Sequence, residues 1–408
     1  MAIGIFNTSM LTADLAKKSF AAAYMRYMPN GNAPLFGLTS MLKSETALSF
    51  EHGFFSKTMV FPEMKTNGGL LLAASTTLTF DTTANLLPGM IMRNERTGEN
   101  IIINTVPTAT TITCSRAIGT VAAAAILDND DWYQVGTAFE ESSLRPAASN
   151  IVPVRVTNLT QIFRNTWAIS GTSGAVQVIA GGSTDAESRQ DCAGFHASDI
   201  EKALFFGQKS SGTRNGQPFR TMAGLIACVE DVTFYPPSYG GVVNSFTAGG
   251  TTNWTQLQGF LNPVFNQATD PHGSSERVLF VGGAAKLVIN EIGRLNGTYQ
   301  LMDGQTNFGL EFTTLTHPRG KFRIIEHPLF NTNAYWSKMA VGVDLPTFGL
   351  AYLAGRQTQN MEFNTKGQQA ADNGIDAVGG TLTTEMTALV KNTPANVVIR
   401  NLTQAAVG

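Results

Sequence analysis

One amphipathic helix is the strongest structural prediction that this sequence makes. Between Asp185 and Gly207, selected positions recur at the three- and four-residue spacing of an α-helix. These positions are Cys192, Phe195, His196, Asp199, Ile200, Ala203 and Leu204. Ser183 or Thr184 is placed to cap the first turn, and Gly207 is expected to end the helix in a left-handed turn. At 1.5 Å per residue, this segment gives a helix ~35 Å long.

Most of the remaining chain reads as strands, with one stretch of mixed helices and strands. Residues 70–135 contain short alternating runs about 8–12 residues apart, which favour a small sheet or a partly closed barrel. Residues 151–180 predict further strands, and residues 207–220 predict a polar hairpin. Helices are then expected at 254–267 and 284–295, a buried strand at 277–283, a hairpin at 308–330, and further strands at 350–363 and 380–402. The predicted fold class is therefore α+β.

The N-terminal residues have the pattern of an arm. Thr12 is placed to cap a helix over 13–28, and the apolar patch at 34–42 is too short to fold alone, so we expect the arm to lie on another surface. Residues 49–67 read as two short extended runs. The first residues do not resemble a signal peptide, and no run approaches the ~20 apolar residues of a membrane helix. We therefore expect a soluble compartment and no membrane partner.

The chain carries unusually few charges. Only 14% of its residues are charged, against about 25% in an ordinary soluble domain. Lys and Arg number 28 and Asp and Glu 30, and the net charge of −2 excludes strong electrostatic steering to nucleic acid. The 43% hydrophobic fraction excludes intrinsic disorder. The surface is thus either polar and neutral, or covered by partners.

Motifs for catalysis, metals and cofactors are weak throughout. The sequence VGGAAK at 281–286 has the wrong spacing for a phosphate loop, and a tight turn is the favoured interpretation. The run Asp128–Asp131 begins like a calcium loop but has Phe139 where the bidentate acid should stand. Glu140 and Glu141 are adjacent, so on a strand they would point to opposite faces. We predict no catalytic residue, metal site or cofactor.

The remaining reactive side chains have plain structural interpretations. Cys114, Cys192 and Cys228 are too few and too scattered for a disulfide framework, so reduced, buried thiols are expected. His196 is expected to pack within the molecule or at an interface, and His317 and His327 to face each other across their hairpin. Solvated or intersubunit ion pairs are expected for the basic residues Arg214, Arg220, Arg319, Lys321 and Arg323.

Six stretches, taken in order, resemble a known family. They are TGENIIINTVPTATTITCSRAIGTVAAAAI (97–126), TNLTQIFRNTWAISGTSGAV (157–176), DIEKALFFGQ (199–208), RTMAGL (220–225), NFGLEF…HPLF (307–330) and GGTLTTEMTALVKNTPANVVIRNL (379–402). Together with the arm, the extended loop and the long helix, their order resembles the major capsid protein of tailed bacteriophages. The resemblance is to the HK-97-like fold, in the subgroup with an extra β subdomain near the E-loop.

The resemblance implies a domain plan. The expected parts are an N-terminal arm (1–48), an E-loop (49–67), an inserted barrel-like β subdomain (68–145), a P-domain (146–220) with its spine helix (185–207), an A-domain (221–340) and P-domain return strands (341–408). Residues expected to pack the spine helix on the P-domain sheet are Cys192, Ile200, Ala203 and Leu204. Ile200→Asp should therefore cost several kcal/mol. Residues expected to make E-loop contacts with a neighbouring subunit are Phe54, Phe55, Lys57 and Phe61.

The resemblance also implies a function and partners. Such a chain assembles with itself into hexamers and pentamers of an icosahedral shell around double-stranded DNA, which it does not read by sequence. The expected path is a procapsid built in the bacterial host cytoplasm that becomes the virion capsid, with a separate scaffolding protein, a portal and possible decoration proteins. Lys57 has no identified Asn partner, so no cross-link is predicted.

Two other functions remain open from the sequence. One is another virion component, such as a tail-tube or decoration protein, which a β-rich neutral chain allows. The other is a β-rich carbohydrate-active enzyme, for which Glu140, Glu141 and Glu362 would be the candidate acids.

Overall fold

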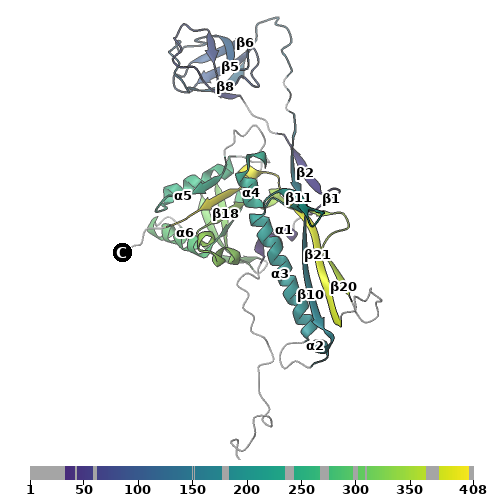
Figure 1. Cartoon of the computed structure of the whole chain (residues 1–408). Coiled ribbons are helices and arrows are strands. Elements are labelled where there is room, and N and C mark those ends of the chain that lie inside the picture. Colours follow the sequence, from purple (N-terminus) through teal and green to yellow (C-terminus); the bar gives the residue numbers. More distant parts are fainter. Residues whose placement is uncertain are drawn as a thin grey trace, which may run out of the picture. The chain divides into compact units, whose positions relative to one another are not determined.

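The computed structural model divides the chain into two compact units (Figure 1). The main unit comprises Met1–Phe55 and Arg155–Gly408, and the inserted unit comprises Ser56–Val154. The residues that the structure describes are 33–41, 44–57, 62–148, 150, 152–176, 183–234, 243–266, 275–296, 302–307, 310–363 and 376–403. The helix expected at 13–28 and the contact residue Phe61 lie outside this set.

The first layer of the main unit is a five-stranded sheet covered by the long helix. Its strands run in the order β1 (Glu45–Ala47), β19 (Phe348–Leu353), β21 (Ala377–Val390) and β10 (Gln161–Ser170), and β20 (Gln359–Phe363) also pairs with β21. Strands β10 and β21 are antiparallel and stay in register from Gln161 opposite Met386 to Ser170 opposite Ala377. The helix α3 (Thr184–Phe206) lies along these two strands (Figure 1). The short helices α1 (Pro34–Ser40) and α2 (Gly171–Ala175) both contact α3.

Helix α3 differs by one residue at each end from the expected 185–207. Ser183 caps it, because its side chain accepts a hydrogen bond from the amide of Ala186 at 3.2 Å. Gly207 does not end it as expected. Its φ of −56° and ψ of 146° are not left-handed. A glycine is needed there because a Cβ would lie 2.5 Å from the carbonyl oxygen of Ala203 and 2.7 Å from that of Met222.

The second layer is a seven-stranded sheet. Its strands run in the order β13 (Ser245–Thr247), β22 (Val397–Arg400), β18 (Ala340–Val343), β14 (Glu276–Val281), β17 (Gly320–Glu326), β16 (Leu310–His317) and β15 (Met302–Asn307). Associated helices are α4 (Leu225–Glu230), α5 (Trp254–Leu261), α6 (Gly283–Asn296) and α7 (Ala334–Ser337). Short 3-10 turns lie at Val232–Phe234, Asn262–Phe265, Pro328–Thr332, Leu345–Thr347 and Thr393–Ala395.

The alternation of β14 explains why its sequence reads as a continuous apolar run. Leu279 and Val281 pack in a core with α5 and α6, whereas Val278 and Phe280 pack in a second core with α3 and α4. A strand covered on both faces has no polar side to alternate with. The seven-stranded sheet is thus the middle layer between two sets of helices.

The C-terminal segment does not return to one sheet. The return strands expected at 341–408 belong to two different sheets. Strand β21 is part of the five-stranded sheet, whereas β22 lies between β13 and β18 in the seven-stranded sheet. Strand β18 also crosses the expected boundary at residue 340. Sequence periodicity predicts that these segments are strands but does not state their partners.

The inserted unit is a six-stranded antiparallel sheet around its own core. The order is β3 (Glu63–Lys65), β8 (Asp131–Thr137), β5 (Met90–Asn94), β6 (Asn100–Thr105), β7 (Thr111–Ser115) and β4 (Thr77–Thr79). Trp132 and Phe80 are fully buried and meet edge to face, with ring centroids 6.1 Å apart. The expected bounds of 68–145 are too narrow, since β3 lies inside the expected E-loop of 49–67.

Two further pairs of strands complete the main unit. Strand β2 (Glu51–Ser56) pairs with β9 (Val154–Leu159), so the inserted unit begins and ends within one two-stranded ribbon. Strands β11 (Ser210–Arg214) and β12 (Gln217–Thr221) form the hairpin predicted at 207–220. The three cysteines are free and buried, as expected.

Candidate functional site

The buried face of α3 holds the helix on the sheets. Ile200 and Leu204 are buried in the largest core, with Phe163 of β10 and Met386 of β21. Cys192 is also buried, and Ala203 is partly buried against the same core. Burying side chains as large as those of Ile200 and Leu204 stabilises the fold by about 1.5–3 kcal/mol each.

A histidine bridges the helix to two strands. His196 of α3 lies with Nδ1 2.8 Å from Oδ1 of Asn165 on β10 and with Nε2 2.8 Å from Oγ1 of Thr384 on β21. Burial lowers the pKa of His196, although Asp199 opposes the shift. The neutral ring can donate one hydrogen bond and accept the other, so both ring nitrogens are satisfied. The expectation of a packed histidine is confirmed.

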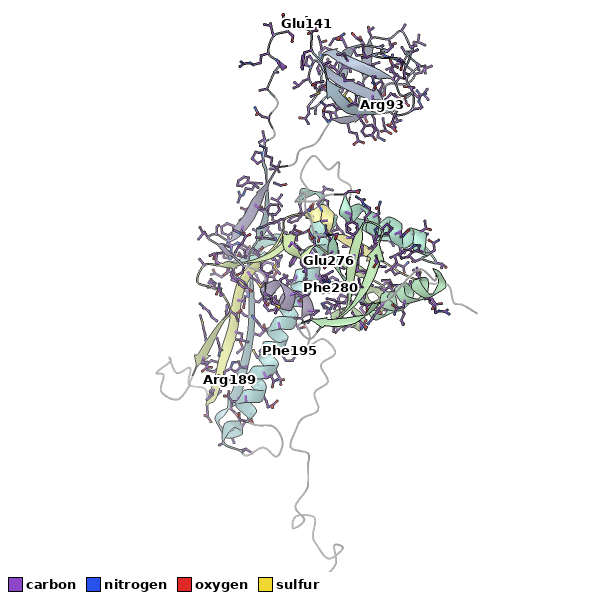
Figure 2. All side chains as sticks on the ribbon, turned by 180° about the vertical axis from the view of Figure 1, so that it is seen from behind. Arg93, Glu141, Arg189, Phe195, Glu276 and Phe280 are labelled. Carbon is purple, nitrogen blue, oxygen red and sulfur yellow. The ribbon has the colours of Figure 1, made fainter. Side chains whose placement is uncertain are left out.

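An ionic cluster around Arg189 fixes the N-terminal half of α3 (Arg189 is labelled in Figure 2). The guanidinium of Arg189 lies 3.1 Å from Asp185, one turn earlier, and 2.5 Å from Glu362 on β20. It also lies over the ring of Trp167, 4.3 Å from the centroid. Glu362, which we considered as a catalytic acid, is thus engaged in holding a strand to a helix.

The main site that the sequence did not predict is a buried junction at Glu201. Its carboxylate accepts hydrogen bonds from the amides of Leu35 and Phe36 at 2.9 and 2.8 Å, which lie in the first turn of α1. It also accepts one from Nε2 of His327 at 2.6 Å, just after β17. Nδ1 of His327 accepts from the amide of Leu329, so the ring proton is on Nε2. One carboxylate therefore joins α1, α3 and the seven-stranded sheet.

Three of the four residues expected to contact a neighbour are described, and they lie on or just beyond β2. Phe54 is partly buried against the main core, whereas Phe55 is 71% exposed and Lys57 is exposed. Gly53 is pressed against β9, because a Cβ there would lie 2.1 Å from the carbonyl oxygen of Val156. The ribbon thus has one side on the core and one side open.

Several candidate residues occupy different places from those expected. His317 stacks on Phe265 near the start of β17, whereas His327 follows the end of that strand, so the two do not face each other. Glu140 and Glu141 are not on a strand. Asp130, in the loop that resembled a calcium site, is bound by Arg96 through two hydrogen bonds of 2.7 Å. Within the described residues no cluster of His, Cys, Asp and Glu could hold a metal ion.

The turn at VGGAAK closes on its own chain. The amide of Gly283 donates to Oδ1 of Asn331 at 2.6 Å, and the amide of Ala284 donates to Oγ of Ser337 at 3.1 Å. The first amides of α6 are therefore occupied by side chains, as a structural turn requires. The tight-turn interpretation is confirmed.

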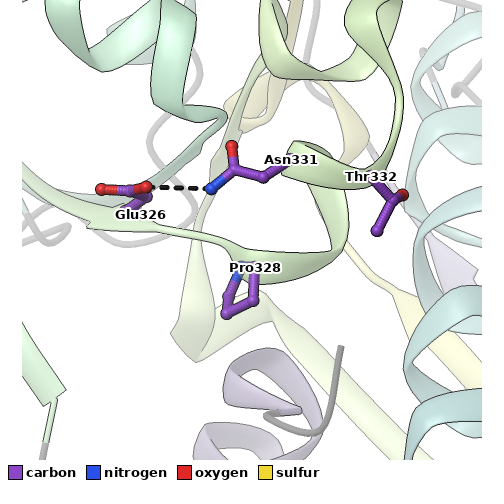
Figure 3. Close-up of a pocket in the computed structure, with 4 residues that line it drawn as sticks. All are labelled: Glu326, Pro328, Asn331 and Thr332. Carbon is purple, nitrogen blue, oxygen red and sulfur yellow. Dashed lines mark hydrogen bonds between the residues drawn. The ribbon is translucent and has the colours of Figure 1, made fainter. Parts of the chain in front are cut away.

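An adjacent pocket of about 370 Å³ is lined by Glu326, Pro328, Asn331 and Thr332 (Figure 3). Its polar groups already have partners. Asn331 donates to Glu326 at 2.9 Å, and Lys286 lies 3.1 Å from the same carboxylate. The hydrogen bond from Asn331, with that from Lys286, keeps the pKa of Glu326 below its ordinary value despite burial. The pocket presents structural pairs and no free reactive group.

Two sequence comparisons match nearly the whole chain. The model of the SU10 major capsid protein family matches residues 7–403. A major capsid protein of Pseudomonas phage PaMx41 is 37% identical over 413 residues, covering 98% of this chain and 96% of that protein. Both matches are to capsid proteins. The chain therefore belongs to the SU10 major capsid protein family.

The chain is also similar to two solved structures. The capsid of an empty GTA particle has a TM-score of 0.48 and 9% identity, covering 98% of this chain and 100% of that chain. Mycobacterium phage Bobi has a TM-score of 0.48 and 8% identity, covering 97% and 99%. The resemblance to phage major capsid proteins is confirmed. The structure contains both helices and largely antiparallel sheets, as the predicted α+β class requires. No helix among the described residues is long and apolar enough to span a membrane.

Proposed function

We propose that this chain is the subunit that builds hexamers and pentamers of an icosahedral phage head around double-stranded DNA. The observation that carries the proposal is apolar surface left open on the elements around α3. Phe55 of the ribbon is 71% exposed, and Phe195 of α3, which Figure 2 labels, is 66% exposed. Leu48, between β1 and β2, and Met361 of β20 are exposed as well. In the proposed shell, neighbouring subunits cover these exposed apolar side chains.

The domain plan gives these surfaces their roles. In this proposal α3 is the spine helix of a P-domain, the β2–β9 ribbon is the E-loop, and the seven-stranded sheet with its helices is the A-domain. Phe54, Phe55, Lys57 and Phe61 then serve the contact of the E-loop with a neighbouring subunit. Cys192, Ile200, Ala203 and Leu204 keep the helix rigid on its sheet.

The low charge of the chain supports a container for DNA. We propose no enzymatic activity for it. A near-neutral protein has little attraction for the phosphate backbone, which suits a shell that holds DNA without gripping it. A separate scaffolding protein, a portal and decoration proteins are the further partners we propose. Assembly would take place in the host cytoplasm and end in the virion.

Electron microscopy of the purified protein tests the proposal. We expect capsomers and closed shells, and tubes would instead indicate a tail protein. Phe195→Asp should lower the yield of shells about tenfold, since it places a charge in a covered apolar surface. The subunit's thermal midpoint should hardly change, because Phe195 is exposed. Lys202→Asp on the same helix is the control. A wild-type chain that stays monomeric under all assembly conditions would disprove the proposal.

A further inference from the structure

The hairpin β11–β12 stands apart from the cores of the main unit. All of β11 and the first three residues of β12 are exposed, and the two strands pair only with each other. Asn215 and Gly216 turn the chain with φ values of 52° and 73°, as a tight hairpin turn requires. A two-stranded hairpin is marginally stable in water on its own. Contact with another chain would therefore stabilise this hairpin.

A cleft separates the hairpin from β10. Its volume is about 260 Å³. The apolar wall consists of Ile162 on β10, which is 50% exposed, with Pro218 and Phe219 on β12. An opening of this size takes apolar side chains, not a whole helix.

The rim of the cleft is basic. Arg214 and Arg220 both line it. The acidic residue in the wall, Glu385, is already bound by Arg356 at 2.6 Å and accepts a hydrogen bond from Thr160 at 2.9 Å. Residues 208–224 contain three basic residues and no acidic one. The cleft therefore favours an occupant that is both acidic and apolar.

Such a segment exists on the chain itself, in Ala138–Leu144. This stretch is exposed along its whole length and has neither helix nor strand. It carries Glu140 and Glu141 beside Phe139, and Leu144 is 92% exposed (Glu141 is labelled in Figure 2). The glutamates of this segment can pair with the arginines at the rim, while an apolar side chain packs against the apolar wall of the cleft. Specific interfaces combine charge and apolar complementarity in this way.

We infer that the cleft between β10 and the β11–β12 hairpin receives the Ala138–Leu144 segment of a second copy of this chain. The inference rests on the proposed shell, in which each cleft is surrounded by further copies. Nucleic acid would satisfy Arg214 and Arg220 but would leave Ile162 and Phe219 uncovered. A polypeptide occupant satisfies both.

Cysteine cross-linking tests the contact directly. The three native cysteines are buried, so engineered thiols at exposed positions react selectively. Chains carrying Ile162→Cys and chains carrying Leu144→Cys are co-expressed, assembled and mildly oxidised. We expect a disulfide-linked dimer in the particles. Leu287→Cys on α6, also exposed, replaces Ile162→Cys in the control and should give none. A chain with both Ile162→Cys and Leu144→Cys that forms only an internal disulfide would overturn the inference.

Charge exchange gives an independent test. Arg214→Glu alone and Glu141→Arg alone should each lower the shell yield about tenfold, and the two together should restore it. Lys321→Glu, an exposed change of the same charge on β17, is the control. Normal shells from all variants would reject this contact while leaving the shell function intact. An absence of shells from the wild-type chain would instead reject the function. Absence of the cross-link, together with reduced DNA retention in Arg214→Glu, would assign the cleft to nucleic acid.

Discussion

Glu201 shows how a single buried carboxylate organises this subunit. It lies on the core side of α3 and is almost fully buried, yet its oxygens accept three hydrogen bonds from α1 and His327. Each donor lies more than a hundred residues away in sequence. Removing the carboxylate would leave two buried donors and one partly buried donor without an acceptor, which costs far more than the loss of one exposed contact.

Glu201→Ala should therefore lower the free energy of unfolding by about 3 kcal/mol. The measurement is urea unfolding of the unassembled subunit. Lys202→Ala, the next residue and exposed on the same helix, should change it by less than about 0.5 kcal/mol. Equal effects of the two substitutions would contradict the junction.

Glu99 in the inserted unit predicts an acid-sensitive fold. Burial alone would raise the pKa of Glu99, but the hydrogen bonds from Arg116, at 2.6 and 2.7 Å, and from the amides of Ala124 and Ala117 outweigh it. The pKa therefore lies below the ordinary 4.5. A carboxylate with a lowered folded pKa contributes stability above its unfolded pKa and loses it as the pH falls further.

The expected result is a thermal midpoint that falls as the pH drops from about 5 to 3. Glu99→Gln should lower the midpoint at pH 7, because the buried Arg116 loses its partner, at a cost of about 3 kcal/mol. Its midpoint should also depend less on pH in that window. A variant that keeps the pH dependence of the wild type would assign it to other acids.

Sequence patterns predict single residues only where local chemistry decides their role. Ser183 is predictable as a cap because capping depends on neighbours a few residues away. Glu201 is not, because its partners come from α1 and from beyond β17, and spacing on one helix cannot show them. The only sign of this buried junction in the sequence was that a charged residue, Glu201, directly follows Ile200 of the apolar face.

At the scale of elements, the apolar face of α3 gives a direct test. Ile200 is buried in the core between the helix and the sheets. Ile200→Asp should cost about 4 kcal/mol or more and abolish shells, because it buries an unpaired charge. Ile200→Val should cost only about 1 kcal/mol and still assemble. Normal assembly of Ile200→Asp would show that Ile200 does not lie on the buried face of α3.

The C-terminal end of α3 gives a second test. Gly207 is required there because there is no room for a Cβ atom, and not because of its backbone angles. At Gly207 a Cβ would clash with two carbonyl oxygens, although its φ of −56° suits any residue. Gly207→Ala should therefore cost about 1–3 kcal/mol through overpacking. Gly212→Ala in the exposed hairpin has no atom within 4 Å of its Cβ and should be nearly neutral. Denaturant midpoints of both variants decide the point.

The elements were more predictable than their pairing. Periodicity and turn residues predicted α3, β14, α6 and the hairpin β16–β17 close to their observed bounds. Strand β8 was not predicted as a separate strand, and the sequence did not show that β21 and β22 join different sheets. Register and partners are set by long-range packing, and the local pattern does not contain that information.

At the scale of the whole molecule, the two units have separate hydrophobic cores. The core of the inserted unit draws only on residues from Met64 to Trp132, and the other cores draw only on the main unit. Units with separate cores unfold separately unless an interface couples them. The boundary at Ser56 was not predictable, because composition and hydropathy do not change there.

Denaturant unfolding of the unassembled subunit should therefore show two transitions. Ile103→Ala, in the core of the inserted unit, should destabilise one by about 3 kcal/mol and leave the other unchanged. Val341→Ala, in the main core, should shift the other transition. A single transition displaced by both variants would mean that the units unfold together.

The β2–β9 ribbon has a consequence for how such a chain can change. Because these strands pair, the chain leaves the main unit and re-enters it at neighbouring points. A segment with adjacent ends is a cassette: it can lengthen, shrink or be exchanged while the path of the remaining chain stays the same. A foreign domain with similarly close termini could be grafted there, which would turn the particle into a regular display of that domain. By the same logic, a lineage could acquire or lose the insertion in one genetic event.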